Sequence, residues 1–363
     1  MKKKALVCLF ILLFLFSSCS GEKIDPKDEN RNGITVTDTV GRTVSVPSDP
    51  KSICCIDPFS GSLTVMFGKG KEITSTCNNV TRSVLLDLIC PGTADITVVK
   101  NSGSVNAEEI LKKNTDLIIV NDGTWDSDDE RKKLELLDIP IVVIGFTDIE
   151  GQFKAIKTVG EALGNEEEAD EYIEFYKNTL RDIKRATAKA PESERPRLYH
   201  SVNEAVRTDY EGSVCAEWIS YTGAVNVALT DKKGIRFNGE KAYTTLEQIY
   251  VWNPDLIICN EPGVDGYILS DEKWRGLDAV KNKRVYGMPV GTSRMGHPTS
   301  TEIPLAAMWL ENLLYPEYYD IDFKKELYDY FLKFYDYEMS DELLDAVITG
   351  TDMRIAKPGN KME

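Results

Sequence analysis

Apolar residues along the chain alternate between short continuous runs and a spacing of three or four positions. This alternation predicts strands that alternate with helices. Short apolar runs bounded by turn residues, such as those at 52–56 and 141–144, are typical of strands covered on both faces. Helical spacing separates these runs, most clearly at 166–189, where apolar residues recur every three or four positions. The short links between elements predict an α/β fold with mostly parallel, doubly wound sheets.

One passage occurs twice in the chain. Residues 107–121 read AEEILKKNTDLIIVN and residues 246–260 read LEQIYVWNPDLIICN, an offset of 246 − 107 = 139 positions. Each copy predicts a short helix, a tight turn and a buried strand that opens into a polar loop, at 121–125 in the first copy. The repeat predicts two similar α/β lobes, with Glu108 and Glu247 at equivalent surface positions.

The helical stretch at 166–189 lies between the two copies and separates the two predicted lobes. At about 1.5 Å per residue this helix is on the order of 35 Å long, enough to join two small lobes stiffly and to limit hinge motion. A hairpin turning at Gly41 precedes the first lobe, and helices at 303–314, 323–337 and 341–348 end the second. The expected segments are a signal peptide (1–18), a tether (19–33), an N-terminal α/β lobe (34–150), an interlobe helix (151–190), a C-terminal α/β lobe with terminal helices (191–350) and a tail (351–363).

The first residues form a targeting segment. Three lysines precede an apolar run at 5–16 that is too short to span a bilayer comfortably. Small residues before Cys19 resemble a bacterial lipobox, which predicts export, cleavage before Cys19 and lipidation of its sulfur. The alternative is an ordinary secretory signal with an incidental cysteine. The polar stretch at 20–32 has no periodic pattern, so we expect a tether that lipid-anchors an extracytoplasmic body to the bacterial cell membrane.

Composition and charge narrow the possible functions. The chain is 42% hydrophobic and 28% charged, which is typical of a globular protein. Its net charge of −16 becomes −16 − 3 = −19 without the three lysines of 1–18, and no basic stripe for nucleic acid is present. No cysteine pair or cluster has zinc-binding spacing. Beyond Cys19 the cysteines are Cys54, Cys55, Cys77, Cys90, Cys215 and Cys259, and whether Cys77 and Cys90 form a disulfide is left open.

Several short motifs occur in an order that resembles a known family. They are the hairpin at 37–43, N-x-E-x-I-L-x-x-x-x-D-L-I-I at 106–119, the long helix, G-S-V-C-A-E at 212–217 leading to G-A-V-N at 223–226, and L-L-Y-P-E at 313–317. Together they resemble the class III substrate-binding proteins of bacterial ABC importers, which serve ferric siderophores, haem, cobalamin and some oxyanions. The resemblance implies a monomer, not an enzyme, that delivers a solute to an ABC permease dimer with a cytoplasmic ATPase.

The same resemblance gives the repeated glutamates a role. In that family a glutamate on each lobe docks onto arginines of the permease, and by position these are Glu108 and Glu247. Two charges held at a fixed separation give register as well as attraction. The alternative is two solvated carboxylates that contribute nothing. Glu109 lies beside Glu108 and leaves open which carboxylate docks.

The solute is expected between the lobes, at the carboxyl ends of the strands. Arginines there clamp anionic groups, and aromatic side chains stack on a chelate or macrocycle. Each also has a plainer interpretation, as a solvated arginine or as an aromatic ring packed at the lobe edge. The candidate ligand-binding residues are Asp57, Phe59, Asn121, Trp125, His200, Arg207, Tyr210, Arg294 and His297.

The histidines bear on metal binding because the chain has only two, His200 and His297. A bare transition-metal site usually gathers three or four His and carboxylate ligands, so the sequence argues against the zinc and manganese branch. We assign no metal site and no cofactor to the protein, although the ligand can itself contain a metal. Axial ligation of haem or cobalt by one histidine is left open.

Two other functions compete with solute binding. A lipid-anchored hydrolase or chelatase has no supporting motif, since G-x-S-x-G, H-E-x-x-H, a P-loop and a post-strand G-x-G-x-x-G are all missing. A surface receptor without a transporter shares the fold but has no need of Glu108 and Glu247. The expected ligand is a small metal chelate, with a ferric siderophore as the default on family frequency, and haem, cobalamin, molybdate or tungstate as alternatives.

Overall fold

The computed structural model describes residues 33–101, 103–239 and 241–355. The predicted signal peptide, the lipidation site Cys19, nearly all of the tether and the tail beyond residue 355 lie outside this range. Among the helices of the described part, none combines the length and the apolar character needed to cross a membrane. The described residues belong to one compact unit.

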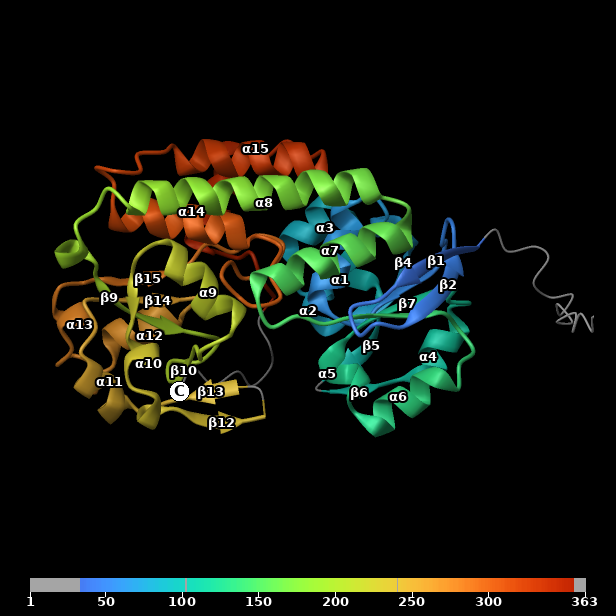
Figure 1. Cartoon of the computed structure of the whole chain (residues 1–363), viewed down its shortest axis with the longest axis horizontal. Coiled ribbons are helices and arrows are strands. Elements are labelled where there is room, and N and C mark those ends of the chain that lie inside the picture. Colours follow the sequence, from blue (N-terminus) through green and yellow to red (C-terminus); the bar gives the residue numbers. More distant parts are fainter. Residues whose placement is uncertain (1–32, 102, 240, 356–363) are drawn as a thin grey trace, which may run out of the picture. The chain divides into compact units, whose positions relative to one another are not determined.

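The apolar runs of the first half form a six-stranded sheet in the order β6-β5-β4-β3-β7-β8 (Figure 1). Neighbouring strands are parallel except β6, which pairs antiparallel with β5 at the edge. Its strands are β3 (Ile53–Cys55), β4 (Ile73–Cys77), β5 (Thr97–Asn101), β6 (Ser104–Val105), β7 (Leu117–Asn121) and β8 (Ile141–Ile144). The predicted hairpin is β1 (Gly33–Thr37) with β2 (Thr43–Pro47).

Helices cover this sheet, and one of them differs from the prediction. They are α1 (Pro58–Met66), α2 (Asn78–Thr81), α3 (Val84–Ile89), α4 (Ala107–Lys112), α5 (Asp122–Trp125), α6 (Asp128–Glu135) and α7 (Ile149–Leu163). Helix α1 begins at Pro58, because Asp57 caps it and proline suits the first helical position. The polar loop expected after β7 is wrong, because Asp122 starts the short helix α5 there.

The second half repeats the parallel sheet on a smaller scale, in the order β11-β9-β14-β15. Its strands are β9 (Arg197–Ser201), β11 (Val225–Asn226), β14 (Leu256–Cys259) and β15 (Val285–Gly287). A small antiparallel sheet that the pattern did not predict consists of β10 (Arg207–Thr208), β12 (Arg236–Asn238) and β13 (Lys241–Tyr243). The helices are α9 (Val214–Tyr221), α10 (Val227–Thr230), α11 (Leu246–Trp252), α12 (Val264–Ser270), α13 (Asp278–Lys281), α14 (Ile303–Leu314), α15 (Phe323–Tyr335) and α16 (Asp341–Thr349).

The predicted interlobe helix is α8 (Glu166–Thr187), which lies beside α7, α14 and α15 in Figure 1. Its buried tyrosines connect both halves of the chain. Tyr176 donates to Oε1 of Gln152 at 2.9 Å, and Tyr172 donates to the carbonyl of Thr301. One continuous cluster of buried apolar side chains runs from the first sheet through α8 to the second sheet and α15. The connection is therefore packed along its length, which resists relative motion of the lobes.

The repeated passage has the same local structure in both copies. Asn114 and Asn253 end their helices with φ of 50° and 40°, a left-handed conformation that asparagine tolerates. The carboxylate of Asp116 accepts from Lys51 N at 2.9 Å and from Ser52 N, and Asp255 accepts from Arg197 N at 2.7 Å. Each aspartate thus fastens its own strand to the start of the neighbouring strand, and that local role explains the repeat.

The first part of the expected tail packs onto the N-terminal half. After α16 the chain pairs with residues 82–84, where Val84 N donates to Met353 O at 3.2 Å and Ile355 N donates to Arg82 O at 3.0 Å. The side chain of Met353 is buried. This contact gives the two halves a second connection besides α8.

Candidate functional site

A cleft of about 640 Å³ opens where the strands of the two halves end. Residues that follow β3, β7 and β8 line one side, and residues that follow β9 and start α9 line the other. The β12–β13 hairpin and the segment 297–299 complete the walls. Polar backbone and side-chain groups collect at the carboxyl ends of parallel strands, so this is the expected location for a ligand.

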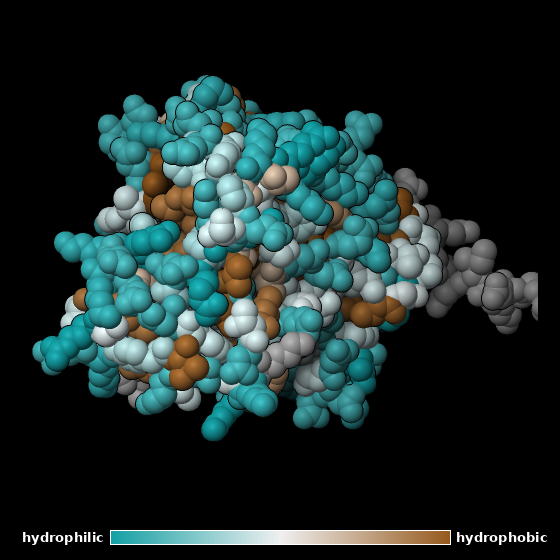
Figure 2. All heavy atoms as spheres, turned by 60° about the vertical axis from the view of Figure 1, so that its left-hand side comes forward, coloured by the Kyte–Doolittle hydropathy of each residue, from teal (hydrophilic) through white to brown (hydrophobic). Residues whose placement is uncertain are grey.

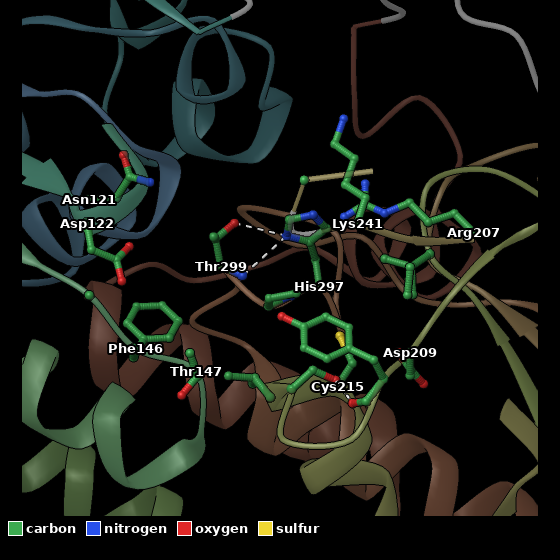
Figure 3. A pocket seen from close by; sticks show the side chains of 18 of the residues that line it. Asn121, Asp122, Phe146, Thr147, Arg207, Asp209, Cys215, Lys241, His297 and Thr299 are labelled. Carbon is green, nitrogen blue, oxygen red and sulfur yellow. Dashed lines mark hydrogen bonds between the residues drawn. The ribbon is translucent and has the colours of Figure 1, made fainter. Parts of the chain in front are cut away.

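Two cations face this cleft in a protein of net charge −16. Arg207 comes from β10 and Lys241 from β13, so the small antiparallel sheet supplies both. Neither side chain has a carboxylate within ion-pair distance among residues 33–101, 103–239 and 241–355. Figure 3 shows Arg207 on the same side as His297, with Asn121 and Asp122 opposite. Cations without a protein counter-ion are available to an anionic solute.

His297 is held as a neutral donor at the cleft. The N–H of Thr299 donates to its Nδ1 at 3.2 Å, and the hydroxyl of Thr299 lies 2.9 Å from the same atom. Burial lowers the pKa of His297 well below its ordinary value, and the nearby Arg294 and Arg207 lower it further. Because Nδ1 accepts, the neutral ring carries its proton on Nε2, where it can donate to a ligand.

Asp57 and Asn121 reach the cleft but have local structural partners. Asp57 accepts from the N–H and the hydroxyl of Ser60 at 3.0 and 2.7 Å, which caps α1. Burial raises the pKa of the Asp57 carboxyl, although these hydrogen bonds oppose the rise. Asn121 Oδ1 accepts from the hydroxyl of Thr124 at 2.6 Å and from Nζ of Lys100 at 3.3 Å. Tyr210 also lines the cleft, with its ring 5.5 Å from that of Phe237.

Four predicted ligand-binding residues do not line the cleft. Phe59 is 1% exposed and packs 4.8 Å from the ring of Phe146, which does line it. Trp125 packs under the guanidinium of Arg42, 4.0 Å from the ring centre. Both aromatic residues therefore take the plainer role of packing within the lobe.

The other two are charged or titratable groups with buried partners. Arg294 donates to the carboxylate of Glu261 in an ion pair that is about nine-tenths enclosed. His200 is fully buried behind the cleft wall, with Nδ1 3.1 Å from Oδ1 of Asp209. A periodic pattern predicts where a strand lies, but it does not predict where the side chains beyond the end of the strand point. The sequence therefore could not distinguish these residues from the residues that line the cleft.

Several other residues that line the cleft were not predicted from the sequence. Thr147 and Thr299 offer hydroxyls, Phe146 offers a ring, and Lys241 offers a cation. Phe146 and Thr147 follow strand β8, which the pattern did predict, so the rule that ligands meet strand ends would have found them. Lys241 had no such signal, because the short, exposed strands around it show no clear alternation.

The segment that carries His297 is fixed by two buried polar side chains. Glu302 accepts from Thr292 N at 2.7 Å and from the hydroxyl of Ser300 at 2.9 Å. Gln152, on α7, donates from Nε2 to the carbonyl of Pro298 at 2.9 Å. Burial raises the pKa of Glu302. The cleft wall at 297–299 is thus held from both lobes.

The two glutamates predicted to dock lie exposed in the first turns of α4 and α11. Glu109 forms an ion pair with Lys112 at 2.5 Å, so Glu108 is the carboxylate that remains without a cation among the described residues. Apolar side chains accompany both positions, with Leu111 52% and Val251 74% exposed. On the face shown in Figure 2 the surface is mostly hydrophilic, and hydrophobic side chains lie in small groups.

The cysteines of the described part are free thiols, so Cys77 and Cys90 do not form a disulfide. Cys54, Cys55 and Cys259 are buried in strands β3 and β14, where they pack as small core residues. Burial raises the pKa of each of these thiols. Such protonated, enclosed thiols are unreactive.

Known proteins resemble the chain over most of its length. The molybdate-binding protein MolA of Haemophilus influenzae is 23% identical over 92% of this chain and 97% of its own. The uncharacterized ABC transporter substrate-binding lipoprotein YvrC of Bacillus subtilis is 23% identical over 79% of this chain and 90% of its own. A solved periplasmic solute binding protein from Veillonella parvula is 26% identical, covers 89% of this chain and 98% of its own, and superposes with a TM-score of 0.74.

The family itself is defined by a profile described as periplasmic binding protein, which matches residues 70–290. That match includes α8, the second parallel sheet and every strand of the first sheet except β3. Two lobes with parallel sheets and a long connecting helix are the architecture of the class III type, as the sequence predicted. Such proteins act outside the cytoplasm as binding components of ABC transporters and are not enzymes. The chain therefore belongs to the periplasmic binding protein family.

Proposed function

We propose that this protein captures an anionic solute in the interlobe cleft and delivers it to an ABC permease. The observation that carries the proposal is the pair Arg207 and Lys241, which face the cleft without a carboxylate partner among the described residues. His297 adds a neutral donor beside them. Charge-assisted hydrogen bonds to an anion are about twice as strong as neutral ones, so these groups select the sign of the ligand.

An anionic metal chelate, with a ferric siderophore as the default, is the first candidate ligand. The cleft volume of about 640 Å³ supports it, because clefts of that size hold solutes of many atoms. Phe146 and Tyr210 offer rings against which a planar chelating group packs. Haem and cobalamin are further members of this size class.

Molybdate or tungstate is the second candidate. A relative that covers nearly the whole chain is a molybdate-binding protein. The hydroxyl of Thr147 lines the same cleft as Arg207, and hydroxyl and guanidinium donors suit a tetrahedral oxyanion. A small oxyanion fills only a small part of the cleft and leaves the rest to water. For this reason we rank the oxyanions behind the larger metal chelates.

Delivery follows from the two exposed glutamates. Glu108 and Glu247 lie on corresponding helices of the two lobes, and we propose that they dock onto cationic groups of a permease dimer. We further propose that lipidation of Cys19 holds the protein at the extracytoplasmic membrane face, close to that partner. The packed helix α8 and the contact of residues 353–355 with the N-terminal half keep the glutamates at a defined separation.

A thermal-shift screen tests the proposed function. The purified protein is heated with ferric siderophores, haem, cobalamin, molybdate and tungstate, because a solute that binds only the folded state raises the melting temperature. We expect one anionic class to give a shift that Arg207→Met removes. Arg185→Met is the matched control, since Arg185 is an exposed arginine on α8 that does not line the cleft. No shift with any of these solutes contradicts the proposal.

A further inference from the structure

Three side chains of different chemistry converge in the C-terminal lobe. They are His200 on β9, Asp209 after β10 and Cys215 in the first turn of α9. One nitrogen, one oxygen and one sulfur atom from them lie within 4.8 Å of one another. Each residue is at most 2% exposed. Asp209 and Cys215 line the cleft (Figure 3), whereas His200 is fully buried and does not line it.

The spacing of these atoms approaches that around a bound metal ion. Zinc lies about 2.3 Å from sulfur and about 2.0–2.2 Å from nitrogen or oxygen, so two ligand atoms of one tetrahedral ion are about 3.3–3.6 Å apart. The observed limit of 4.8 Å requires the side chains to close in on the ion by about 1 Å. All three residues belong to one lobe, so the arrangement does not depend on how the lobes close.

The hydrogen bonds around the cluster identify the atoms that an ion would engage. Nδ1 of His200 lies 3.1 Å from Oδ1 of Asp209, and Sγ of Cys215 donates to the carbonyl of Gly296 at 3.2 Å, so a bound ion replaces both contacts. Nε2, the other ring nitrogen of His200, is buried and has no hydrogen-bond partner in the described part of the chain. Asn226 donates to Oδ2 of Asp209 at 2.7 Å and thereby fixes the carboxylate. Outer groups that orient a ligating carboxylate in this way are typical of metal sites.

We propose that His200, Asp209 and Cys215 bind a divalent late first-row metal ion such as Zn²⁺ or Co²⁺. Thiolate and imidazole ligands favour these ions, whereas Mg²⁺ and Ca²⁺ prefer oxygen ligands alone. We assigned no metal site from the sequence because the chain has only two histidines. In the cluster, the cysteine provides the donor atom that a further histidine would supply. Three protein ligands leave a fourth position for another donor.

The position of the cluster adds a consequence that rests on the proposed function. Asp209 and Cys215 line the same cleft as Arg207, so an ion held by them adds positive charge beside the anion-binding groups. An oxygen atom of the captured solute then occupies the fourth position. The protein-held ion and the solute are expected to bind with positive cooperativity, because each stabilises the other.

The test is a titration of the purified protein, without a polyhistidine tag and without any solute, with Co²⁺. We expect one ion per chain and the intense near-ultraviolet absorption that Co²⁺ gives when bound to a thiolate. Cys215→Ala should abolish the absorption. Asn226→Asp removes the amide donor that orients Asp209 and keeps the side-chain oxygen that caps α10, so it should weaken binding about 10- to 100-fold while leaving the absorption intact at saturation.

Cys259→Ala is the matched control, because Cys259 is an equally buried cysteine on β14 of the same lobe and lies outside the cluster. It should keep both the absorption and the affinity. Wild-type protein that binds no Co²⁺, or Cys215→Ala that binds it with unchanged absorption, overturns the proposal. If Cys215→Ala does not fold, X-ray absorption of the Zn²⁺-loaded wild type decides instead. One sulfur at about 2.3 Å supports the site, and a shell without sulfur refutes it.

Failure of this proposal is distinguishable from failure of the proposed function. Metal binding is measured with no solute present, and the thermal-shift screen is run with chelator-treated protein. A protein that binds Co²⁺ through Cys215 but no anionic solute keeps the metal site and loses the proposed function. A protein that binds an anionic solute but no Co²⁺ keeps the function and loses the metal site.

Discussion

Glu311 provides a test of how burial controls the stability of this fold. It lies on α14, is fully buried, and accepts from the hydroxyl of Thr187, the last residue of α8, at 2.8 Å. Its second oxygen has no hydrogen-bond partner among the described residues. Burial raises the pKa of Glu311 from its ordinary 4.5 to about 7. The folded state therefore favours the protonated, neutral form of this side chain over the charged carboxylate.

The sign of the pH effect follows from that direction. Because the folded state keeps the proton to higher pH than the unfolded state, stability falls as pH rises from about 4.5 to about 7. The difference 7 − 4.5 corresponds to about 3.4 kcal/mol at 1.36 kcal/mol per pKa unit. Part of the loss has occurred by pH 5, which leaves about 2–2.5 kcal/mol between pH 5 and pH 8.

The perturbation is Glu311→Gln, which keeps the shape and removes the titration. Urea unfolding at pH 5 and pH 8 should show the free energy of unfolding of the variant, relative to wild type, rising by about 2–2.5 kcal/mol between the two values. Any cost of burying the amide is the same at both pH values and cancels. Glu135→Gln, at an exposed position on α6, is the control and should show no such change. Equal pH dependence of wild type and Glu311→Gln refutes the reasoning.

Three further results are expected. Replacing both Glu108 and Glu247 with Lys should abolish uptake and leave solute affinity unchanged, whereas replacing the exposed Glu135 and Glu174 with Lys should not affect uptake. Transport at the wild-type rate by the Glu108 and Glu247 variant would remove the docking role. Asp116→Ala loses two hydrogen bonds to backbone N–H groups and Asp255→Ala loses one. Urea unfolding should therefore show the free energy of unfolding falling by about 1–2 kcal/mol in Asp116→Ala and by about half as much in Asp255→Ala. Equal losses in the two variants would contradict this role of the aspartates. Gln152→Leu removes the acceptor of Tyr176 and the donor to Pro298, and should lower the free energy of unfolding by about 2–4 kcal/mol; a change below 1 kcal/mol contradicts the role of Gln152.

Most of the fold followed from the periodicity of the sequence. Strands β7 and β8 are buried along their length, so they appear as unbroken apolar runs, and α8 shows its apolar face at helical spacing. The repeat indicated the two lobes because both copies need the same residues for the same local purpose. Asn114 and Asn253 adopt left-handed turns, and Asp116 and Asp255 fasten neighbouring strands.

The small sheet of β10, β12 and β13 was not predictable in the same way. Its strands have two or three residues each, and β12 is exposed throughout, so no alternation of apolar and polar positions marks them. That sheet nevertheless supplies Arg207 and Lys241 to the cleft. Arg207 was selected as a cation in a loop, whereas Lys241 resembled any other surface lysine.

The direction of side chains at strand ends was the other limit. Phe59 was expected at the cleft because it follows β3, but Asp57 starts α1 immediately and turns Phe59 into the core against Phe146. The cluster of His200, Asp209 and Cys215 joins residues that come from three successive elements. Their proximity depends on tertiary packing, so no spacing rule for metal ligands revealed it.

A calorimetric titration tests the central claim most directly, that Arg207 and Lys241 capture an anionic solute in the cleft. The ligand is the solute that gives the largest thermal shift. The account predicts binding of one molecule per chain, weakened about 10- to 150-fold in Arg207→Met because a hydrogen bond to a charged group contributes about 1.5–3 kcal/mol. Arg185→Met should bind like wild type. Equal affinity of wild type and Arg207→Met, or binding only of uncharged solutes, contradicts the account.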